Sequence, residues 1–173
     1  ASPYYVHGEP GRLAGPILEN LCEEIQETVA LAVWGNRGAT IVRIVDAGAP
    51  ITITLRAGTV LSLCKSATGR AFVAFFRSPF LKQMLDDELR EAAEAGKTAV
   101  TTIRRQLEKT LTHIREQFIS RATGSLTPRI NGFSAPVFDH SGRMVAAITS
   151  LGAVGEFNVE WDSPVAKAML AAA

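Results

Sequence analysis

Strand-like segments in this chain occur as adjacent pairs. "TVALAVW" (28–34) and "TIVRIVDA" (40–47) are separated by the turn residues "GNRGA", and "INGFSAPVFD" (130–139) leads through "DHSG" into "RMVAAITSLG" (143–152). Two strands joined by a short turn pair as an antiparallel hairpin. "ITITLRA" (51–57) alternates between apolar and polar residues and predicts one more strand. Because strands follow strands and do not alternate one-to-one with helices, the sequence predicts an α+β domain with an antiparallel sheet.

The segments around these hairpins carry apolar residues at helical spacing. A stripe over 13–25 predicts a first helix, and a second helix begins near Ser66. Residues 78–96 predict one or two short helices, and 163–173 begin as a capped helix. A longer helix lies between them, with these candidate cap and core-facing residues: Thr101 or Thr102, then Ile103, Leu107, Leu111, Ile114 and Phe118.

Length and charge limit the class of protein. A chain of 173 residues suits a single domain, and 18 Lys and Arg against 17 Asp and Glu leave a net charge of +1. That balance argues against a surface built to grip nucleic acid or an anionic membrane. No apolar run approaches the roughly 20 residues that span a bilayer, and the N-terminus lacks the features of a signal peptide. We expect a cytoplasmic protein with reduced cysteines, and the missing initiator Met suggests a piece of a longer chain.

Motifs for catalysis and metal binding are largely missing. The sequence contains no Walker loop, no G-x-G-x-x-G and no H-E-x-x-H, and its three histidines lie far apart. "GFSAP" around Ser134 lacks the last glycine of a nucleophile elbow. "SLCK" (62–65) matches S-x-x-K without the accompanying motifs of serine acyl-enzymes. We therefore expect no enzyme, no metal and no cofactor, and keep a small enzyme that uses Cys64 or Ser62 as an alternative.

The opening of the second helix is unusually small. Ser66, Ala67, Thr68 and Gly69 precede a body that is expected to be buried. A helix start leaves backbone N–H groups without intrahelical partners. Ser66 or Thr68 can cap some of them. Alternatively, the small side chains let a ligand approach the N–H groups, where the helix carries partial positive charge.

Three segments together resemble one protein family. "ATGRAFVAF" (67–75), "GFSAPVFDHSGRMVAAITS" (132–150) and "ETVALAVW" (27–34) are similar, in order and spacing, to motifs of the effector-binding domain of IclR-type bacterial transcriptional regulators. The resemblance extends from about Gly8 to Ala173. It implies a GAF-like antiparallel sheet flanked by helices. It also implies one ligand-sensing domain over 1–173, without the winged helix-turn-helix that reads DNA in full-length members.

The resemblance also implies partners and a pocket. The family's domains bind a small organic effector and assemble as homodimers or tetramers, and DNA is contacted only through the N-terminal domain that this chain lacks. Carried over by position, the residues expected to bind the effector are Leu61, Ala67, Thr68, Ile130, Gly132, Thr149 and Leu151. Ile51 and Ile53 are expected to close the apolar side.

The chain departs from the family pattern just before the second hairpin. "SRATGSLTPRING" (120–132) has no acidic residue, and Arg129 and Gly132 stand where Gly and Cys are usual. Arg121 and Arg129 are candidates to pair with an anionic effector. A glycine at 132 is expected to enlarge that corner of the pocket. These departures favour a carboxylate bulkier than the smallest keto acids, aromatic acids included.

Two further readings stay open. A GAF-type sensor with a non-transcriptional output would have the same pocket, and an interaction module would have a collapsed one. The basic run Arg104, Arg105, Lys109 and Arg115 is most simply the solvated face of a helix. Within it, Arg104 and Glu108 are spaced as an i,i+4 pair.

Overall fold

Both predicted hairpins are present in the computed structural model, which describes residues 9–48 and 55–173. The first joins β1 (Thr28–Gly35) to β2 (Gly38–Val45), and the second joins β4 (Ile130–Phe138) to β5 (Met144–Ala153). A short strand, β3 (Ser120–Thr123), completes a five-stranded sheet of order β2-β1-β5-β4-β3 in which every named pair is antiparallel. The predicted α+β fold class is confirmed.

The pairing of β1 with β5 joins the two hairpins into one sheet. Thr28 lies opposite Leu151 and Ala30 lies opposite Thr149. This contact closes a loop of more than a hundred residues that contains three helices. The strands of the late hairpin also contact the second predicted helix, Ala67–Phe75.

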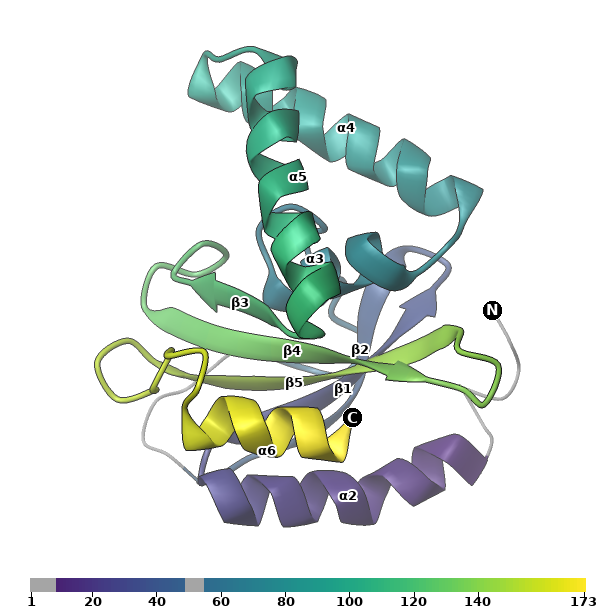
Figure 1. The fold of residues 1–173 in the computed structure, drawn as a ribbon, viewed down its shortest axis with the longest axis vertical. Helices are drawn as coiled ribbons and strands as arrows, with labels where there is room; N and C mark the ends of the chain where they lie inside the picture. Colours follow the sequence, from purple (N-terminus) through teal and green to yellow (C-terminus); the bar gives the residue numbers. More distant parts are fainter. Residues whose placement is uncertain (1–8, 49–54) are drawn as a thin grey trace.

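Helices cover both faces of the sheet, as Figure 1 shows. One face carries α2 (Glu9–Ile25) and α6 (Pro164–Ala172), and the other carries α3 (Ala67–Phe75), α4 (Pro79–Gly96) and α5 (Val100–Gln117). Each face has its own apolar core. The α2–α6 side buries Leu18, Val29, Phe133 and Met169 among others, and the α3–α5 side buries Ile41, Phe72, Leu89 and Leu111 among others.

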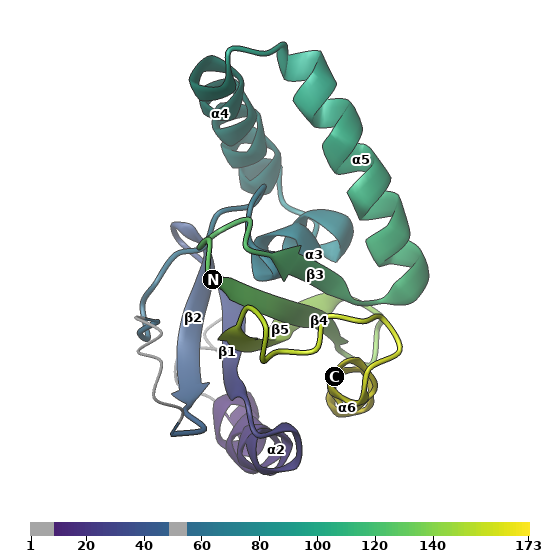
Figure 2. The same cartoon turned by 90° about the vertical axis from the view of Figure 1, so that its left-hand side faces the viewer.

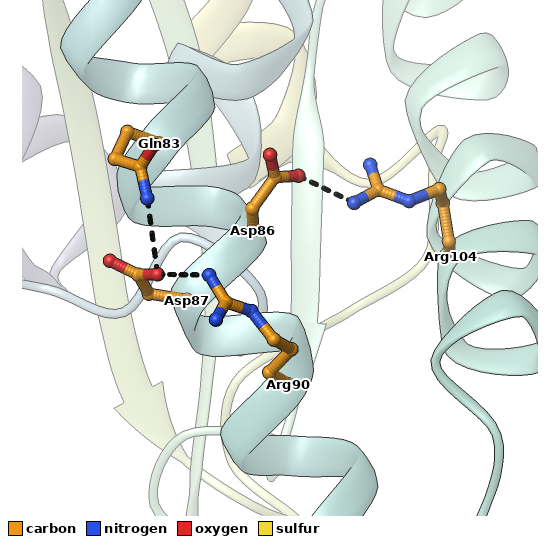
Figure 3. Close-up of polar contacts among 5 residues, drawn as sticks. All are labelled: Gln83, Asp86, Asp87, Arg90 and Arg104. Atoms are coloured by element: carbon orange, nitrogen blue, oxygen red, sulfur yellow. Dashed lines mark hydrogen bonds and ion pairs between the residues drawn. The ribbon is translucent and has the colours of Figure 1, made fainter.

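The α4–α5 pair projects away from the sheet (Figures 1 and 2). An ion pair joins the two helices, with Arg104 Nη2 lying 2.5 Å from Asp86 Oδ1 (Figure 3). The expected Arg104–Glu108 pair is therefore wrong. Glu108 instead lies 4.0 Å from Arg115 Nη1. Arg90 pairs with Asp87 within α4, at 2.6 Å.

Several boundaries differ from the sequence-based expectation. Residues 78–96 form one helix after Ser78, whose side chain accepts from Phe80 N. The cap of α5 is Ala99, without a side-chain hydrogen bond, so Thr101 and Thr102 lie inside the first turn. At the other end, Phe118 adopts a φ of 58° and terminates the helix with half of its side chain exposed.

The predicted strand at 51–57 falls partly outside the described residues. Leu55–Ala57 belong to no strand, and Val60 forms an isolated bridge with Thr40 of β2. Among the helices of the described ranges, none combines the length and apolar character that a bilayer crossing requires.

Candidate functional site

The start of α3 is capped and still leaves donors over. Ser66 Oγ accepts a hydrogen bond from Gly69 N at 2.8 Å, which confirms Ser66 as the cap. The backbone N–H groups of Ala67 and Thr68 precede the first intrahelical bond, made by Arg70 N to Ser66 O at 3.1 Å. Within the part of the chain that the structure describes, no acceptor is bonded to either group. The cap and a ligand site are therefore compatible at this turn.

Gly69 brings this turn close to the preceding loop. A Cβ at this position would collide with the carbonyl oxygen of Ser62 and stand 2.7 Å from Leu63 Cα. Only glycine allows the helix and loop backbones to approach this closely. The small residues at the helix start therefore have a packing cause as well.

A cavity opens beside these N–H groups, under the first turn of α3 and over β3, β4 and β5. It offers about 50 Å³ to the centres of water-sized molecules, a space for a few atoms. All seven residues predicted for the effector site line it: Leu61, Ala67, Thr68, Ile130, Gly132, Thr149 and Leu151. Ile51 and Ile53 lie outside the described residues.

Six further lining residues were not predicted: Leu55, Ser66, Ala122, Leu126, Thr127 and Asn131. Ala122 enters because β3 pairs with β4 in a register that sets Ala122 opposite Gly132. No turn motif in the sequence predicts that β3 pairs with β4, so sequence analysis could not place Ala122 in the cavity. None of the lining residues carries a charge.

Buried hydroxyl groups connect α3 to the floor of the cavity. Thr68 Oγ1 lies 2.6 Å from Thr149 Oγ1, and Thr149 Oγ1 donates to Ser134 Oγ at 3.0 Å. Ser120 stands next in the same row, opposite Ser134, and its buried Oγ has no hydrogen-bond partner among the described residues. A hydroxyl row across three strands thus ends at a helix start with free donors.

The structure places neither arginine among the residues that line the cavity. Side chains of neighbouring residues on a strand point to opposite faces of the sheet. Because Ala122 faces the cavity, Arg121 points away from it. Arg121 Nη1 donates to Val159 O at 3.0 Å, and its guanidinium lies over the Trp161 ring, 4.2 Å from the centroid. Arg129 is exposed. The expected role of Arg121 beside the effector is therefore incompatible with its position here.

The corner at Gly132 is also partly filled. A Cβ at Gly132 would stand 2.9 Å from Leu151 Cδ2 and 2.8 Å from the carbonyl oxygen of Ser150. The leucine side chain occupies space that the missing side chain was expected to leave open. The glycine at 132 therefore allows close packing against Leu151 and gives no reason to expect a bulky ligand.

Glu88 of α4 organises the loop before α3, a role that no sequence motif indicates. Its carboxylate accepts hydrogen bonds from Ser62 Oγ at 2.8 Å, Leu63 N at 2.8 Å and Cys64 N at 3.1 Å. Burial, with the nearby Glu88 charge, raises the pKa of the Cys64 thiol to about 12. The thiol is therefore protonated at neutral pH, which does not suit a nucleophile.

In the S-x-x-K segment the serine hydroxyl takes part in the turn. Ser62 Oγ donates to Glu88 and accepts from the backbone N of Lys65 at 3.1 Å. Across 9–48 and 55–173, no three His, Cys, Asp or Glu side chains gather in a way that would hold a metal ion.

Comparisons with known proteins identify relatives of this chain. The family model "Bacterial transcriptional regulator IclR C-terminal" matches residues 11–173. The HTH-type transcriptional regulator RhmR of Escherichia coli (strain K12) is 27% identical over 161 residues, which cover 93% of this chain and 61% of that protein.

Solved structures agree. The crystal structure of Pseudomonas aeruginosa HmgR is 34% identical with a TM-score of 0.80, covering 93% of this chain and 62% of that chain. The Thermotoga maritima IclR structure, at 21% identity and a TM-score of 0.73, covers 93% of this chain and 64% of that one, and shows the fold. The chain thus spans about six tenths of the length of RhmR and HmgR.

Proposed function

This chain belongs to the C-terminal domain family of IclR bacterial transcriptional regulators, and on that basis we propose that it is the effector-binding domain of such a regulator, sensing a small organic carboxylate. The observation that carries the proposal is the cavity under the first turn of α3, where the Ala67 and Thr68 N–H groups have no acceptor among the described residues. A carboxylate there would accept both hydrogen bonds and meet the positive end of the helix dipole.

The proposed ligand is small and partly apolar. The cavity wall is mostly aliphatic, with hydroxyl groups of Thr68 and Thr149 at its floor. Because no charged side chain of the described residues lines it, the helix start supplies the electrostatic stabilisation of the anion. Aromatic acids are the competing class, and they would require the wall around Leu151 to move.

The proposed action of the bound ligand on transcription rests on the family to which the chain belongs. The chain spans about six tenths of its regulator relatives, one of which is described as HTH-type. We propose that a DNA-reading domain belongs to the same protein, that these domains pair as homodimers or tetramers in the cytoplasm, and that the ligand shifts their arrangement. A ligand can do this only if it binds the two arrangements with different affinity. A GAF-type sensor with another output is the alternative, and the coding sequence preceding Ala1 discriminates them.

A thermal-shift screen of the chain against short keto acids, sugar acids and aromatic carboxylates tests the ligand class. A ligand at about a hundred times its dissociation constant adds roughly 2.7 kcal/mol of stability, which raises the melting temperature measurably. Amides of the same acids are the chemical controls, because they lack the charge that the helix start favours.

A variant at the cavity mouth locates the site. Leu126 lines the cavity and is 43% exposed, so Leu126→Trp is expected to block entry without disturbing the core. Leu170→Trp is the matched control, because Leu170 is 41% exposed on α6, on the other face of the sheet. Loss of the ligand shift in L126W alone supports the proposal. An equal shift in both variants would place the ligand elsewhere, and no shift with any acid would contradict the proposed ligand class.

A further inference from the structure

A second concave site lies at the edge of the sheet, beside β3 and separate from the effector cavity. Its volume is about 450 Å³, and its principal residues are Arg70, Lys109, Thr110, His113, Arg121 and Trp161. We call it the basic groove. It shares no lining residue with the cavity described above. The first turn of α3 separates the two, since Thr68 faces the cavity and Arg70 the groove.

The basic groove gathers positive charge from three elements. Arg70 comes from α3, Lys109 from α5 and Arg121 from β3, so residues 39 and 51 positions from Arg70 meet there through folding alone. Among the described residues, no acidic side chain lines the groove. None of the four ion pairs among the described residues involves these three cations. Three cationic side chains that line one hollow, with no acidic residue among its described lining residues, favour an anion there.

The two arginines are held in place and keep donors to spare. Arg70 Nε donates to Cys64 O at 2.7 Å and Arg70 Nη1 donates to Arg121 O at 3.1 Å. Arg121 is fixed by its bond to Val159 O and by stacking on Trp161. A guanidinium has five N–H donors, so each arginine retains donors without an acceptor in the described structure. Guanidinium groups that are already held in position lose little conformational entropy when they bind a phosphate or carboxylate.

A buried polar atom with an unmet hydrogen bond adds to this arrangement. The His113 ring packs against Trp161 at 4.6 Å between centroids, and its buried Nε2 has no partner among the described residues. Buried polar groups without a partner are rare in native proteins and call for an explanation. Thr110 contributes a hydroxyl group to the same lining, although it also bonds to Gln106 O at 3.3 Å.

We propose that the basic groove is a second ligand site, which takes a phosphate group, either as the inorganic ion or as part of a phosphorylated metabolite. A tetrahedral dianion matches several separate cationic donors better than the single carboxylate proposed for the effector cavity. The sequence predicts Lys109 on the solvated basic face of a helix and Arg121 at the effector site. Folding gives them another place: Arg104 pairs with Asp86, whereas Lys109 lines the basic groove together with Arg70 and Arg121.

Calorimetric titration with inorganic phosphate, pyrophosphate and glycerol phosphate, at constant ionic strength, tests the proposal. Lys109→Gln is the primary variant, because Lys109 is exposed and its removal leaves the core intact. Arg105→Gln is the matched control, as Arg105 is an exposed cation on the same helix outside the groove. Arg121→Gln is the second variant. We expect the groove variants to bind at least about tenfold more weakly, with R105Q unchanged.

The variant Leu126→Trp, which is expected to block the effector cavity, distinguishes binding in the groove from binding in that cavity. Phosphate binding that persists in L126W and falls in K109Q and R121Q supports a second site. Binding of glycerol phosphate well above inorganic phosphate identifies a metabolite as the ligand, and the reverse order identifies the free ion. Equal binding in wild type, K109Q and R105Q, loss in L126W, or no binding to any of the three probes would overturn the proposal.

Discussion

The hydroxyl oxygens of Thr68 and Thr149 lie 2.6 Å apart, although 81 residues separate them in the chain. This contact fastens the first turn of α3 to β5 and thereby fixes the distance between the helix start and the cavity floor. Both side chains are almost completely buried, so their hydroxyl groups depend on one another and on Ser134 for hydrogen bonds. The geometry of the cavity follows from this small polar cluster inside an apolar surrounding.

Removing the central hydroxyl of this cluster is expected to destabilise the fold. Thr149→Val keeps the shape of the side chain and leaves Thr68 and Ser134 without their partner, which costs about 1–3 kcal/mol of the free energy of unfolding. Urea unfolding measures it, and Thr149→Ser is the control that retains the hydroxyl. We expect Thr68→Val combined with Thr149→Val to cost less than the sum of the single changes. Additive losses would mean that the contact does not couple the two residues.

Replacing two helical glycines by alanine should change the stability of the fold in opposite directions. Gly69→Ala forces a Cβ against the Ser62 carbonyl and is expected to lower the free energy of unfolding by about 1–3 kcal/mol. Gly96→Ala, at the end of α4, finds its nearest neighbour at 3.7 Å and gains helix propensity, so stability stays the same or rises by up to about 1 kcal/mol. Thermal denaturation of both variants distinguishes the cases, and an unaffected G69A would contradict the close approach.

The Cys64 thiol should react slowly in the folded protein. Its pKa is raised from 9.0 to about 12, so near neutral pH the thiolate fraction falls about a thousandfold below that of an ordinary thiol. We expect alkylation in a Cys22→Ala background to be slow until denaturant is added. Labelling of the native protein at the rate of a free cysteine would restore the reading in which Cys64 is a nucleophile.

The same pKa shift predicts a loss of stability in alkali. Between pH 9 and pH 12 the unfolded chain releases the Cys64 proton while the folded chain retains it, so stability decreases as pH rises. Below pH 9 both states hold the proton, and the effect vanishes. We expect Cys64→Ala to flatten the decline of the melting temperature through this window relative to the wild type. Identical pH profiles would show that the thiol does not contribute.

Neutralising Glu88 should loosen the loop that precedes α3. Glu88→Gln leaves one acceptor oxygen for the three donors and turns an NH2 group toward the remaining ones. We expect the free energy of unfolding to fall by about 1–3 kcal/mol. Glu91→Gln is the control, because Glu91 is exposed on the same helix. Hydrogen exchange at the amides of Leu63 and Cys64 should accelerate in E88Q and not in E91Q. Comparable exchange in the two variants would refute the role of Glu88.

Local sequence patterns specify most of the helices and both hairpins. Turn residues at 35–39 and 139–142 specify the two hairpins, and the apolar stripe of α5 specifies its buried side, because hairpin turns and helical periods are encoded by residues close in the chain. The resemblance of three segments to one family named seven residues, and the structure shows that all seven line one cavity. The cap at Ser66 likewise follows from a few adjacent residues.

The contacts between these elements follow from strand pairing over long stretches of the chain. The pairing of β1 with β5 and of β3 with β4 sets Thr149 beneath Thr68, turns Arg121 away from the cavity and brings it to Arg70 and Lys109. The departure of residues 120–132 from the family pattern suggested that Arg121 pairs with the effector, but the alternation of the edge strand and the Trp161 ring settle its direction. Such contacts depend on register and on closure over long stretches of chain, which local patterns do not contain. The chain encodes its helices and strands locally, and its cavity and its basic groove exist only where distant segments meet.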